Sequence, residues 1–176
     1  MSDFELIESS PILETAIFEV THDRAEHPSG AVIDRAIVHN QPAAVVLAQD
    51  EKNRVLLIRQ YRLPVRGQLL ELPAGRCDNG ESPLDAAQRE LAEETGYRAT
   101  RWVQLTDFFT SPGFSTAHMY AFLAEELTPG DPSPESYEII EQHWMSWSKA
   151  LAAVRQGTIR DAKTIATLLY CDAFVR

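Results

Sequence analysis

Residues 75–97 read GRCDNGESPLDAAQRELAEETGY, a glycine-containing loop that leads into a run of helix-forming residues. Ser82 and Asp85 fit the N-cap and the partner position of a capping box. Gly96 fits the left-handed residue that follows many helices. These signals predict a helix over Pro83–Thr95, with proline at its first position.

Helical geometry distributes these residues over two faces. The apolar stripe expected to face the core consists of Leu84, Ala87 and Leu91. The opposite side is expected to carry Ala86, Glu90, Glu93 and Glu94. Carboxylates one turn apart repel one another, and Arg89 can offset part of this by pairing with Glu93. The acidic side is either a solvated face or a site for a hard cation such as Mg²⁺ or Mn²⁺, which prefers oxygen ligands.

The whole stretch has the spacing G-x5-E-x7-R-E-U-x-E-E-x-G-U, where U is apolar. This spacing resembles the Nudix box at each defined position. The resemblance implies a Nudix α/β/α sandwich with a mixed sheet, and a hydrolase that splits a diphosphate bond with Mg²⁺, for which Mn²⁺ can substitute. It makes Glu90, Glu93 and Glu94 metal ligands. Glu93 is also expected to take part in catalysis. Arg89, which can pair with Glu93, is expected to orient it and not to contact the substrate.

Composition and charge limit the classes of function. The 176 residues carry a formal net charge of -10, which argues against nonspecific binding to nucleic acid or to an anionic membrane. No apolar run reaches the roughly 18 residues of a spanning helix, and the first residues do not resemble a signal peptide. We therefore expect a cytoplasmic protein with a small-molecule substrate. Cys77 and Cys171 form neither a metal nor a disulfide pattern, so both are expected to be buried or incidental thiols.

The first 40 residues are expected to form β structure. Strands are predicted at Glu14–Thr21 and Ala31–His39, with turn residues at His27–Gly30 between them. This arrangement resembles the antiparallel N-terminal extension of ADP-ribose pyrophosphatases within the Nudix family. There the extension supports a homodimer, often by exchange between subunits, and lends residues to the adenosine pocket; the alternative is a simple edge hairpin. The implied division is 1–40 for the extension and 41–176 for the hydrolase domain.

The run Arg59–Pro64 reads RQYRLP and resembles the R-Q-Y-R-x-P signature of the same subgroup. The resemblance assigns contact with the substrate diphosphate to Arg62, and we place Tyr61 beside it in the substrate site. A guanidinium suits phosphate oxygens well. Glu71 is either a substrate contact or a buried hydrogen-bonded carboxylate. In the family the alanine that enters the box often binds metal through its carbonyl, which implies this role for Ala74.

Two loops after the helix complete the candidate site. Pro112 lies fifteen residues beyond Tyr97, as in the ADP-ribose pyrophosphatase subgroup, and we place Pro112 and Gly113 at the substrate. Relatives often continue with an acidic pair, which is absent from the segment 115–118 of this chain.

In relatives a later loop brings the catalytic base over the site, with two glutamates two residues apart. Glu138 matches the second of them and is a candidate base and metal ligand. Glu135 lies one residue before the position of the first and is the other candidate base. The alternative is that both are solvated loop charges.

The remaining elements are expected as follows. Strands are predicted at Ala43–Ala48, Val55–Ile58, Arg98–Asp107, His118–Glu126 and Ile139–Trp147. A short helix is predicted at Ser148–Gln156, and a final helix begins after Asp161 as N-cap. Its expected apolar stripe is Ile165, Ala166, Leu169 and Ala173. The segment before it resembles the family's C-terminal G-x-I-x-D-x-K-T run, to which we assign a structural role.

These observations indicate a Mg²⁺-dependent pyrophosphohydrolase. The resemblance favours ADP-ribose as substrate, with AMP and ribose 5-phosphate as products. An alternative is a nucleotide sugar or a dinucleotide such as NADH or diadenosine polyphosphate, because of the departure at 115–118. An alternative of another class is a Nudix module that senses ADP-ribose without cleaving it. The retained carboxylates argue against this module, because a full set of hard-ion ligands implies a working site.

Overall fold

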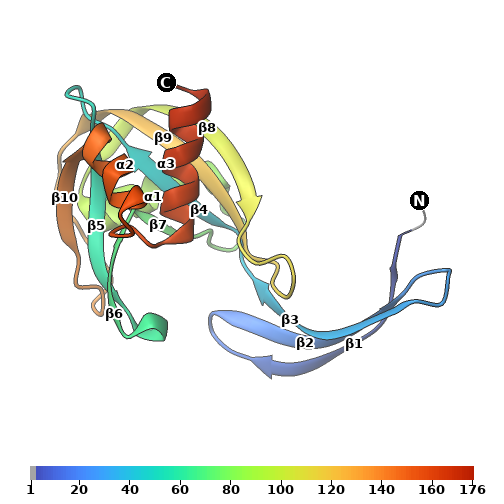
Figure 1. Ribbon diagram of the computed structural model, residues 1–176. Coiled ribbons are helices and arrows are strands. Elements are labelled where there is room, and N and C mark those ends of the chain that lie inside the picture. The colour runs from blue at the N-terminus through green and yellow to red at the C-terminus, as the bar shows by residue number, and fades with distance from the viewer. Residues whose placement is uncertain (1–2) are drawn as a thin grey trace. The chain divides into compact units, whose positions relative to one another are not determined.

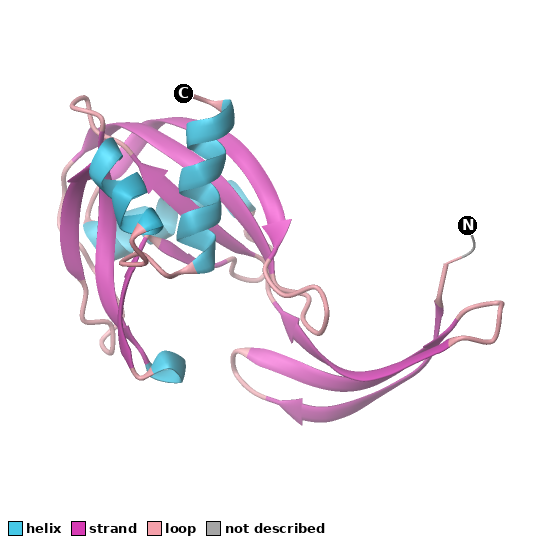
Figure 2. Cartoon of the chain, in the orientation of Figure 1, coloured by secondary structure: helices cyan, strands magenta, loops and turns pink. Residues whose placement is uncertain are grey.

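The computed structural model describes residues 3–176 and divides the chain into two compact units (Figures 1 and 2). The first unit comprises the chain up to Gln41 together with Phe109–His118. The second comprises Pro42–Phe108 and Met119–Arg176. Within the described residues, no helix combines the length and apolar character needed to cross a bilayer.

The first unit is an antiparallel sheet in the order β1-β2-β3. Its strands are β1 (Glu5–Glu14), β2 (Phe18–Glu26) and β3 (Val32–Asn40). This confirms the expected antiparallel extension. The predicted strand Glu14–Thr21 was wrong, because it spans the turn between β1 and β2. There the hydroxyl of Thr15 accepts hydrogen bonds from the backbone N–H groups of Ile17 and Phe18.

Strand β1 was not predicted separately, since all ten of its residues are exposed and a strand without a buried face has no clear polarity pattern. The turn between β2 and β3 lies where it was predicted. The N–H of His27 donates to Ala31, and Gly30 adopts a φ of 84°.

The segment 109–118 is held against β3 by backbone and side-chain hydrogen bonds. The N–H of Val38 donates to the carbonyl of Phe114 over 2.8 Å, and the N–H of Thr116 donates to the carbonyl of Val38 over 3.0 Å. A side-chain bond of 3.1 Å runs from Arg35 Nη1 to the carbonyl of Gly113. The loop that contains Pro112 therefore belongs structurally to the N-terminal sheet.

The second unit contains two sheets. The mixed sheet has the order β7-β4-β9-β8, in which β4 pairs antiparallel with β7 and parallel with β9. The other sheet has the order β10-β5-β6 and is antiparallel. The strands are β4 (Ala43–Ala48), β5 (Arg54–Arg62), β6 (Gly67–Glu71), β7 (Ala74–Arg76), β8 (Arg98–Phe109), β9 (His118–Thr128) and β10 (Glu141–Ser146). The five strands predicted for this part of the chain are present, β4 with the predicted bounds and the others with shifted ends, whereas β6 and β7 were not predicted. A 3₁₀ turn, η1 (Leu63–Val65), joins β5 to β6.

Three helices pack on the sheets from two sides: α1 (Pro83–Thr95) and α3 (Ala162–Phe174) contact β4, and α2 (Trp147–Arg155) contacts α3, β5 and β10. Strand β4 alternates its side chains between two cores, because successive residues of a strand point to opposite faces. Val45 and Leu47 pack in the core that contains α2 and α3, and Val46 packs in the core that contains α1. Figure 1 shows α2 and α3 side by side, and the arrangement is the expected α/β/α sandwich.

Helix α1 has the predicted bounds and caps. Ser82 accepts a hydrogen bond from the N–H of Asp85, and Gly96 is left-handed with a φ of 74°. The assignment of its faces was wrong in part, since Leu84 is 37% exposed whereas Ala86 and Glu94 are buried. Glu94 follows Leu91 by three residues and therefore shares its buried face.

Helix α3 begins after Asp161, which accepts a bond from the N–H of Thr164, as predicted. Its predicted stripe was wrong in part, because Leu169 is 46% exposed and Ala173 is exposed, whereas Ile165 packs against the core. The buried face carries Thr164, Thr167, Leu168 and Cys171. Two of these are threonines whose hydroxyls bond to backbone atoms, Thr164 with Leu72 and Thr167 with Lys163. A polarity pattern does not reveal such a face.

The end of α1 is fixed to the loop that follows β9. The N–H of Ser133 donates to the carbonyl of Glu93 over 2.9 Å. A Cβ on Gly96 would overlap the carbonyl oxygen of Gly130, so the two backbones touch where no side chain fits. Glycine at position 96 thus serves both the left-handed cap and this close approach. The loop 129–140 is thereby anchored at one end to the acidic helix.

Candidate active site

Three glutamates of α1 differ sharply in burial. Glu94 is 3% exposed, and its Oε2 accepts a hydrogen bond of 3.0 Å from the N–H of Ala74. The side chain of Glu90 is 14% exposed, and that of Glu93 is 41% exposed. A Cβ on Gly75 would overlap the carboxylate of Glu90, so only glycine lets this carboxylate lie against strand β7. The solvated-face interpretation is therefore wrong for Glu94 and Glu90.

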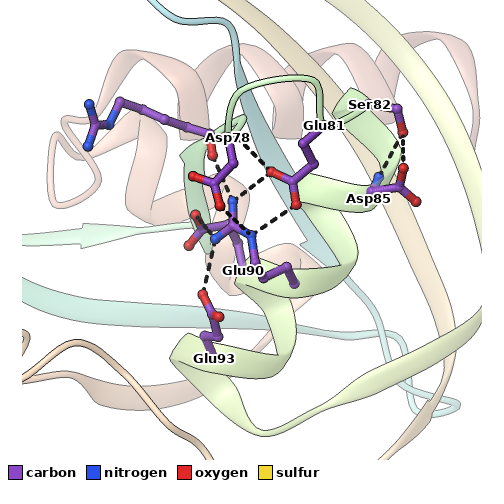
Figure 3. Close-up of polar contacts among 8 residues, drawn as sticks. Asp78, Glu81, Ser82, Asp85, Glu90 and Glu93 are labelled. Carbon is purple, nitrogen blue, oxygen red and sulfur yellow. Dashed lines mark hydrogen bonds and ion pairs between the residues drawn. The ribbon is translucent and has the colours of Figure 1, made fainter. Parts of the chain in front are cut away.

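Arg89 holds the outer carboxylates in place, and its hydrogen bonds use all five of its N–H groups. It donates to Oε1 of Glu90 over 2.7 Å, to Oε2 of Glu93 over 3.1 Å and to the carbonyl of Arg76 over 2.8 Å. Two further bonds, of 3.0 and 2.9 Å, reach the carboxylate of Glu81. Figure 3 shows Glu81, Glu90 and Glu93 converging from the loop and the helix. Because its donors are occupied, Arg89 serves to orient carboxylates.

Glu81 was given no role by the sequence reasoning, although it occupies a defined position of the motif. Its Oε2 also accepts a bond of 2.8 Å from the N–H of Asp78, which ties the loop to the start of α1. The hydrogen bonds with Arg89 lower the pKa of Glu81 below its usual value. Its fixed position in the motif was the signal that could have found it.

Burial and mutual repulsion raise the pKa values of the inner carboxyls. Burial is the main cause for Glu94, and the charges of Glu90 and Glu138 add to it, raising its pKa to about 8. Burial also raises the pKa of Glu90, with further contributions from Glu93 and Glu138. Such a site attracts a cation, because a positive charge relieves repulsion that the fold otherwise sustains.

The two loop glutamates lie in different surroundings. Glu138 is half-buried and close enough to raise the pKa values of Glu90 and Glu94. Its Oε2 accepts a 3.1 Å bond from the N–H of Glu135, which stabilises the turn between them. Glu135 is exposed, and its carboxylate accepts a hydrogen bond from the hydroxyl of Tyr137 and so raises the pKa of that phenol. The structure thus associates Glu138 with the carboxylates of α1.

Arg62 lies at the end of β5 and is held by Glu71. Its Nε and Nη2 donate to the two oxygens of Glu71 over 3.0 and 2.8 Å. The hydrogen bond to Glu71 and the charge of Glu94 both raise the pKa of Arg62, which places the guanidinium within the field of the buried helix carboxylate. Glu71 is 1% exposed, so the role of a buried hydrogen-bonded carboxylate matches its position. Tyr61, next to Arg62, is 53% exposed.

Pro112 and Gly113 belong to the first unit. There they line a recess of about 330 Å³ together with residues of all three strands. The remaining lining residues are Leu6, Asp23, Ala25, Ile33, Arg35 and Ile37. The recess combines aliphatic walls with one guanidinium and one carboxylate.

The donor set fits a hard divalent cation, since it offers carboxylate oxygens and the carbonyl of Ala74. Among residues 3–176, no three Asp, Glu, His or Cys side chains are already gathered at metal-ligand positions. Glu90 and Glu93 are turned toward Arg89, and Glu94 is turned toward the N–H of Ala74. Cys77 and Cys171 are free and buried, as expected.

The fold and this site define a Nudix protein. Residues 39–168 match the NUDIX domain family, and the chain belongs to it. It is a pyrophosphatase-like enzyme of a family that acts on nucleotide derivatives and typically uses divalent metal ions.

Two curated relatives and one solved structure are similar to the chain over most of its length. The chain is 34% identical over 166 residues to an ADP-ribose pyrophosphatase of Bacillus subtilis, covering 93% of this chain and 90% of the relative. It is 34% identical over 180 residues to a GDP-mannose pyrophosphatase of Cronobacter sakazakii, covering 93% of this chain and 92% of that relative. A crystal structure of an ADP compounds hydrolase superposes with a TM-score of 0.88 at 20% identity, covering 99% of this chain and 95% of that one.

The burial of Glu94 leads to a prediction for metal-free protein. Its pKa is about 8 in the folded chain, against an ordinary value of 4.5, so between these values the folded state binds more protons than the unfolded state. The free energy of unfolding should therefore fall as pH rises through this window. Glu94→Gln keeps the acceptor for the N–H of Ala74 and removes the charge. At the upper end of this pH window, its free energy of unfolding should therefore exceed that of wild type by about 1–3 kcal/mol.

Urea unfolding at both ends of the window, in buffer without divalent ions, measures this difference. Glu135→Gln is the control, because that carboxylate is exposed and its removal should leave the pH dependence unchanged. A wild-type protein whose stability does not change over the window, or a Glu94→Gln variant less stable at the upper end, would contradict the assigned burial.

Proposed function

We propose that the chain hydrolyses the diphosphate bond of ADP-ribose to give AMP and ribose 5-phosphate, with Mg²⁺ as cofactor and Mn²⁺ as a substitute. The observation that carries this proposal is the guanidinium of Arg62, which is fixed by Glu71 and lies in the field of Glu94. A diphosphate needs positive charge on both sides, and this arrangement offers an arginine beside a cation-attracting cluster. Similarity to the Bacillus subtilis ADP-ribose pyrophosphatase supports the choice of substrate.

The residues that would hold the metal are Glu90, Glu93, Glu94, Glu138 and, through its carbonyl, Ala74. A divalent ion bound there polarises phosphoryl oxygens and lowers the pKa of a coordinated water. Arg89 keeps the carboxylates of Glu90 and Glu93 near each other, which prepares oxygen ligands before the ion arrives. Arg62 directs its remaining N–H groups at phosphate oxygens.

We assign the general base to Glu138. A base must lie within reach of the attacking water and must be unprotonated near neutral pH. Glu138 is the loop glutamate whose charge acts on the buried carboxyls of α1, which supports a position at the reacting centre. The anchored end of the loop, at Gly130 and Ser133, supports the same position.

We propose that Pro112 and Gly113 take part in substrate binding through the recess that they line in the first unit. Its aliphatic walls suit the face of a base or sugar, and Arg35 and Asp23 supply hydrogen-bonding groups. GDP-mannose is the second candidate substrate, supported by the similarity to the Cronobacter sakazakii enzyme. The absence of the acidic pair at 115–118 is the feature of the chain that favours keeping GDP-mannose as the second candidate.

Substrate choice is tested with a panel of ADP-ribose, GDP-mannose, NADH and diadenosine polyphosphate, each assayed with Mg²⁺, with Mn²⁺ and with chelator. We expect the highest kcat/KM for ADP-ribose and no turnover with chelator. AMP and ribose 5-phosphate are identified by chromatography. Preference for GDP-mannose would refute the substrate proposal, and full activity with chelator would refute the metal requirement.

The assignment of the base is tested with a matched pair of loop variants. Glu138→Gln should lower kcat by about 10²–10⁴-fold, the usual contribution of a general base. Glu135→Gln, three residues away in the same loop, should stay within a few-fold of wild type. Initial rates at saturating ADP-ribose give kcat for both. The reverse order of the two losses would transfer the role of base to Glu135.

We propose that residues 1–40 form a dimerising extension of the hydrolase domain 41–176, and that the protein is a homodimer. The support is strand β1, whose exposed apolar side chains include Leu6 at 62% and Ile12 at 57%. Light scattering should give about twice the chain mass of 19.7 kDa. The double variant Leu6→Asp and Ile12→Asp should give monomers, whereas Leu169→Asp on α3 should not. A monomeric wild-type protein would refute the proposal.

A further inference from the structure

A buried carboxylate joins two sheet strands to the last helix of the chain. Glu71, on β6, is 1% exposed. Its Oε1 accepts the bond from Nε of Arg62, and its Oε2 accepts bonds from Nη2 of Arg62 at 2.8 Å and from Nζ of Lys163 at 2.6 Å. Lys163 lies on α3, 92 residues further along the chain. One carboxylate thus receives two cations from different elements.

The network is closed at the helix by Asp161. Nζ of Lys163 lies 3.0 Å from Oδ1 of Asp161, and Lys163 is 13% exposed. Asp161 is also the N-cap of α3, where its Oδ2 accepts from the N–H of Thr164. Two carboxylates therefore balance two cations, which is the condition under which charges can stay buried. Although burial raises the pKa of Glu71, the bonds from Arg62 and Lys163 lower it below its usual value.

The consequence for Arg62 is a fixed direction. A guanidinium is planar and carries five N–H groups, and Glu71 binds two of them along one edge. The side chain of Arg62 is 38% exposed, so its other edge can meet a ligand. A donor that is already oriented loses less conformational entropy on binding than a free one.

Lys163 contributes to this orientation through Glu71. The two cations share Oε2 of Glu71, so the ammonium limits where that oxygen can move. Removing Lys163 would leave the oxygen with Arg62 alone and would leave Asp161 without its cation. The carboxylate could then rotate, and the plane of the Arg62 guanidinium would rotate with it.

We propose that Lys163 is a positioning residue for the diphosphate, which acts through Glu71 to fix the guanidinium of Arg62. This inference rests on the proposed function, since it takes Arg62 as a ligand of the diphosphate. It extends the site to α3, a helix to which the sequence resemblance gives only a structural role.

The experiment compares Lys163→Met, Lys163→Arg and a packing control, Leu168→Val. Leu168 is fully buried on the same helix and contacts the core, so its shortening loosens α3 without touching the charges. Two quantities are measured: KM for ADP-ribose with Mg²⁺, and Kd for the methylene-bridged analogue of ADP-ribose without divalent ions. Thermal melting reports the stability of each variant.

We expect Lys163→Met to raise both constants about tenfold, within the range for coupling through a packed network. Lys163→Arg keeps the cation and should restore most of the affinity. Leu168→Val should lower the melting temperature and leave both constants unchanged. In an Arg62→Ala background, Lys163→Met should have no further effect, because its influence passes through that guanidinium.

Additive effects of Lys163→Met and Arg62→Ala would overturn the proposal, as would unchanged constants in Lys163→Met. A loss of affinity in Leu168→Val equal to that in Lys163→Met would do so as well, because it would indicate a general loosening of α3. If wild type cleaves GDP-mannose and not ADP-ribose, the substrate proposal fails. The same cycle on GDP-mannose and its methylene analogue then decides the role of Lys163.

Discussion

The burial of the Glu94 carboxylate is the constraint around which the second unit is arranged. A lone carboxylate loses hydration when it leaves water, and Glu90 and Glu138 add like charge to the same region. The fold supplies a partial remedy in the N–H of Ala74 and in the positive charge of Arg62, both of which lower the pKa of Glu94. What remains is an unrelieved negative potential, and a cation is the species that can relieve it.

Two arginines, Arg89 and Arg62, lie near these carboxylates and differ in how the protein binds them. Arg89 is saturated by five hydrogen bonds to three carboxylates and one carbonyl, whereas Arg62 is bound along one edge by Glu71 and its side chain is 38% exposed. The two side chains have the same donors, and they differ in how many of these donors the protein already occupies. Different roles for the two arginines were expected from their motifs, but the number of occupied donors is seen only in the structure, because several of the hydrogen-bond partners lie on other elements.

The sequence was sufficient to predict a helix or strand where the contacts that determine its bounds lie close together along the chain. The bounds and caps of α1 followed from Ser82 and Gly96, and the strands β4, β8 and β9 of the mixed sheet followed from short apolar runs, whereas β7 was not predicted. The face of α1 that carries Glu94 was misassigned, because charge was used as a guide to exposure where packing against β4 and β7 decides it. The pairing of Glu71 with Lys163 joins positions 92 residues apart, and no local pattern contains it.

The hydrogen bonds between β3 and the tip of the β8–β9 hairpin determine which segments of the chain fold together. Val38 and Asn40 bond directly to Phe114 and Thr116, so the N-terminal strands and a segment over seventy residues away form a single folded piece. A chain shortened to begin at Pro42 would lose the partners of the Phe114 carbonyl and the Thr116 amide, and with them the contacts that fix this hairpin tip. The chain passes from one unit to the other at three points, after Gln41, Phe108 and His118. An exchange of the first unit between proteins therefore has to transfer both of its segments, the amino-terminal strands and residues 109–118.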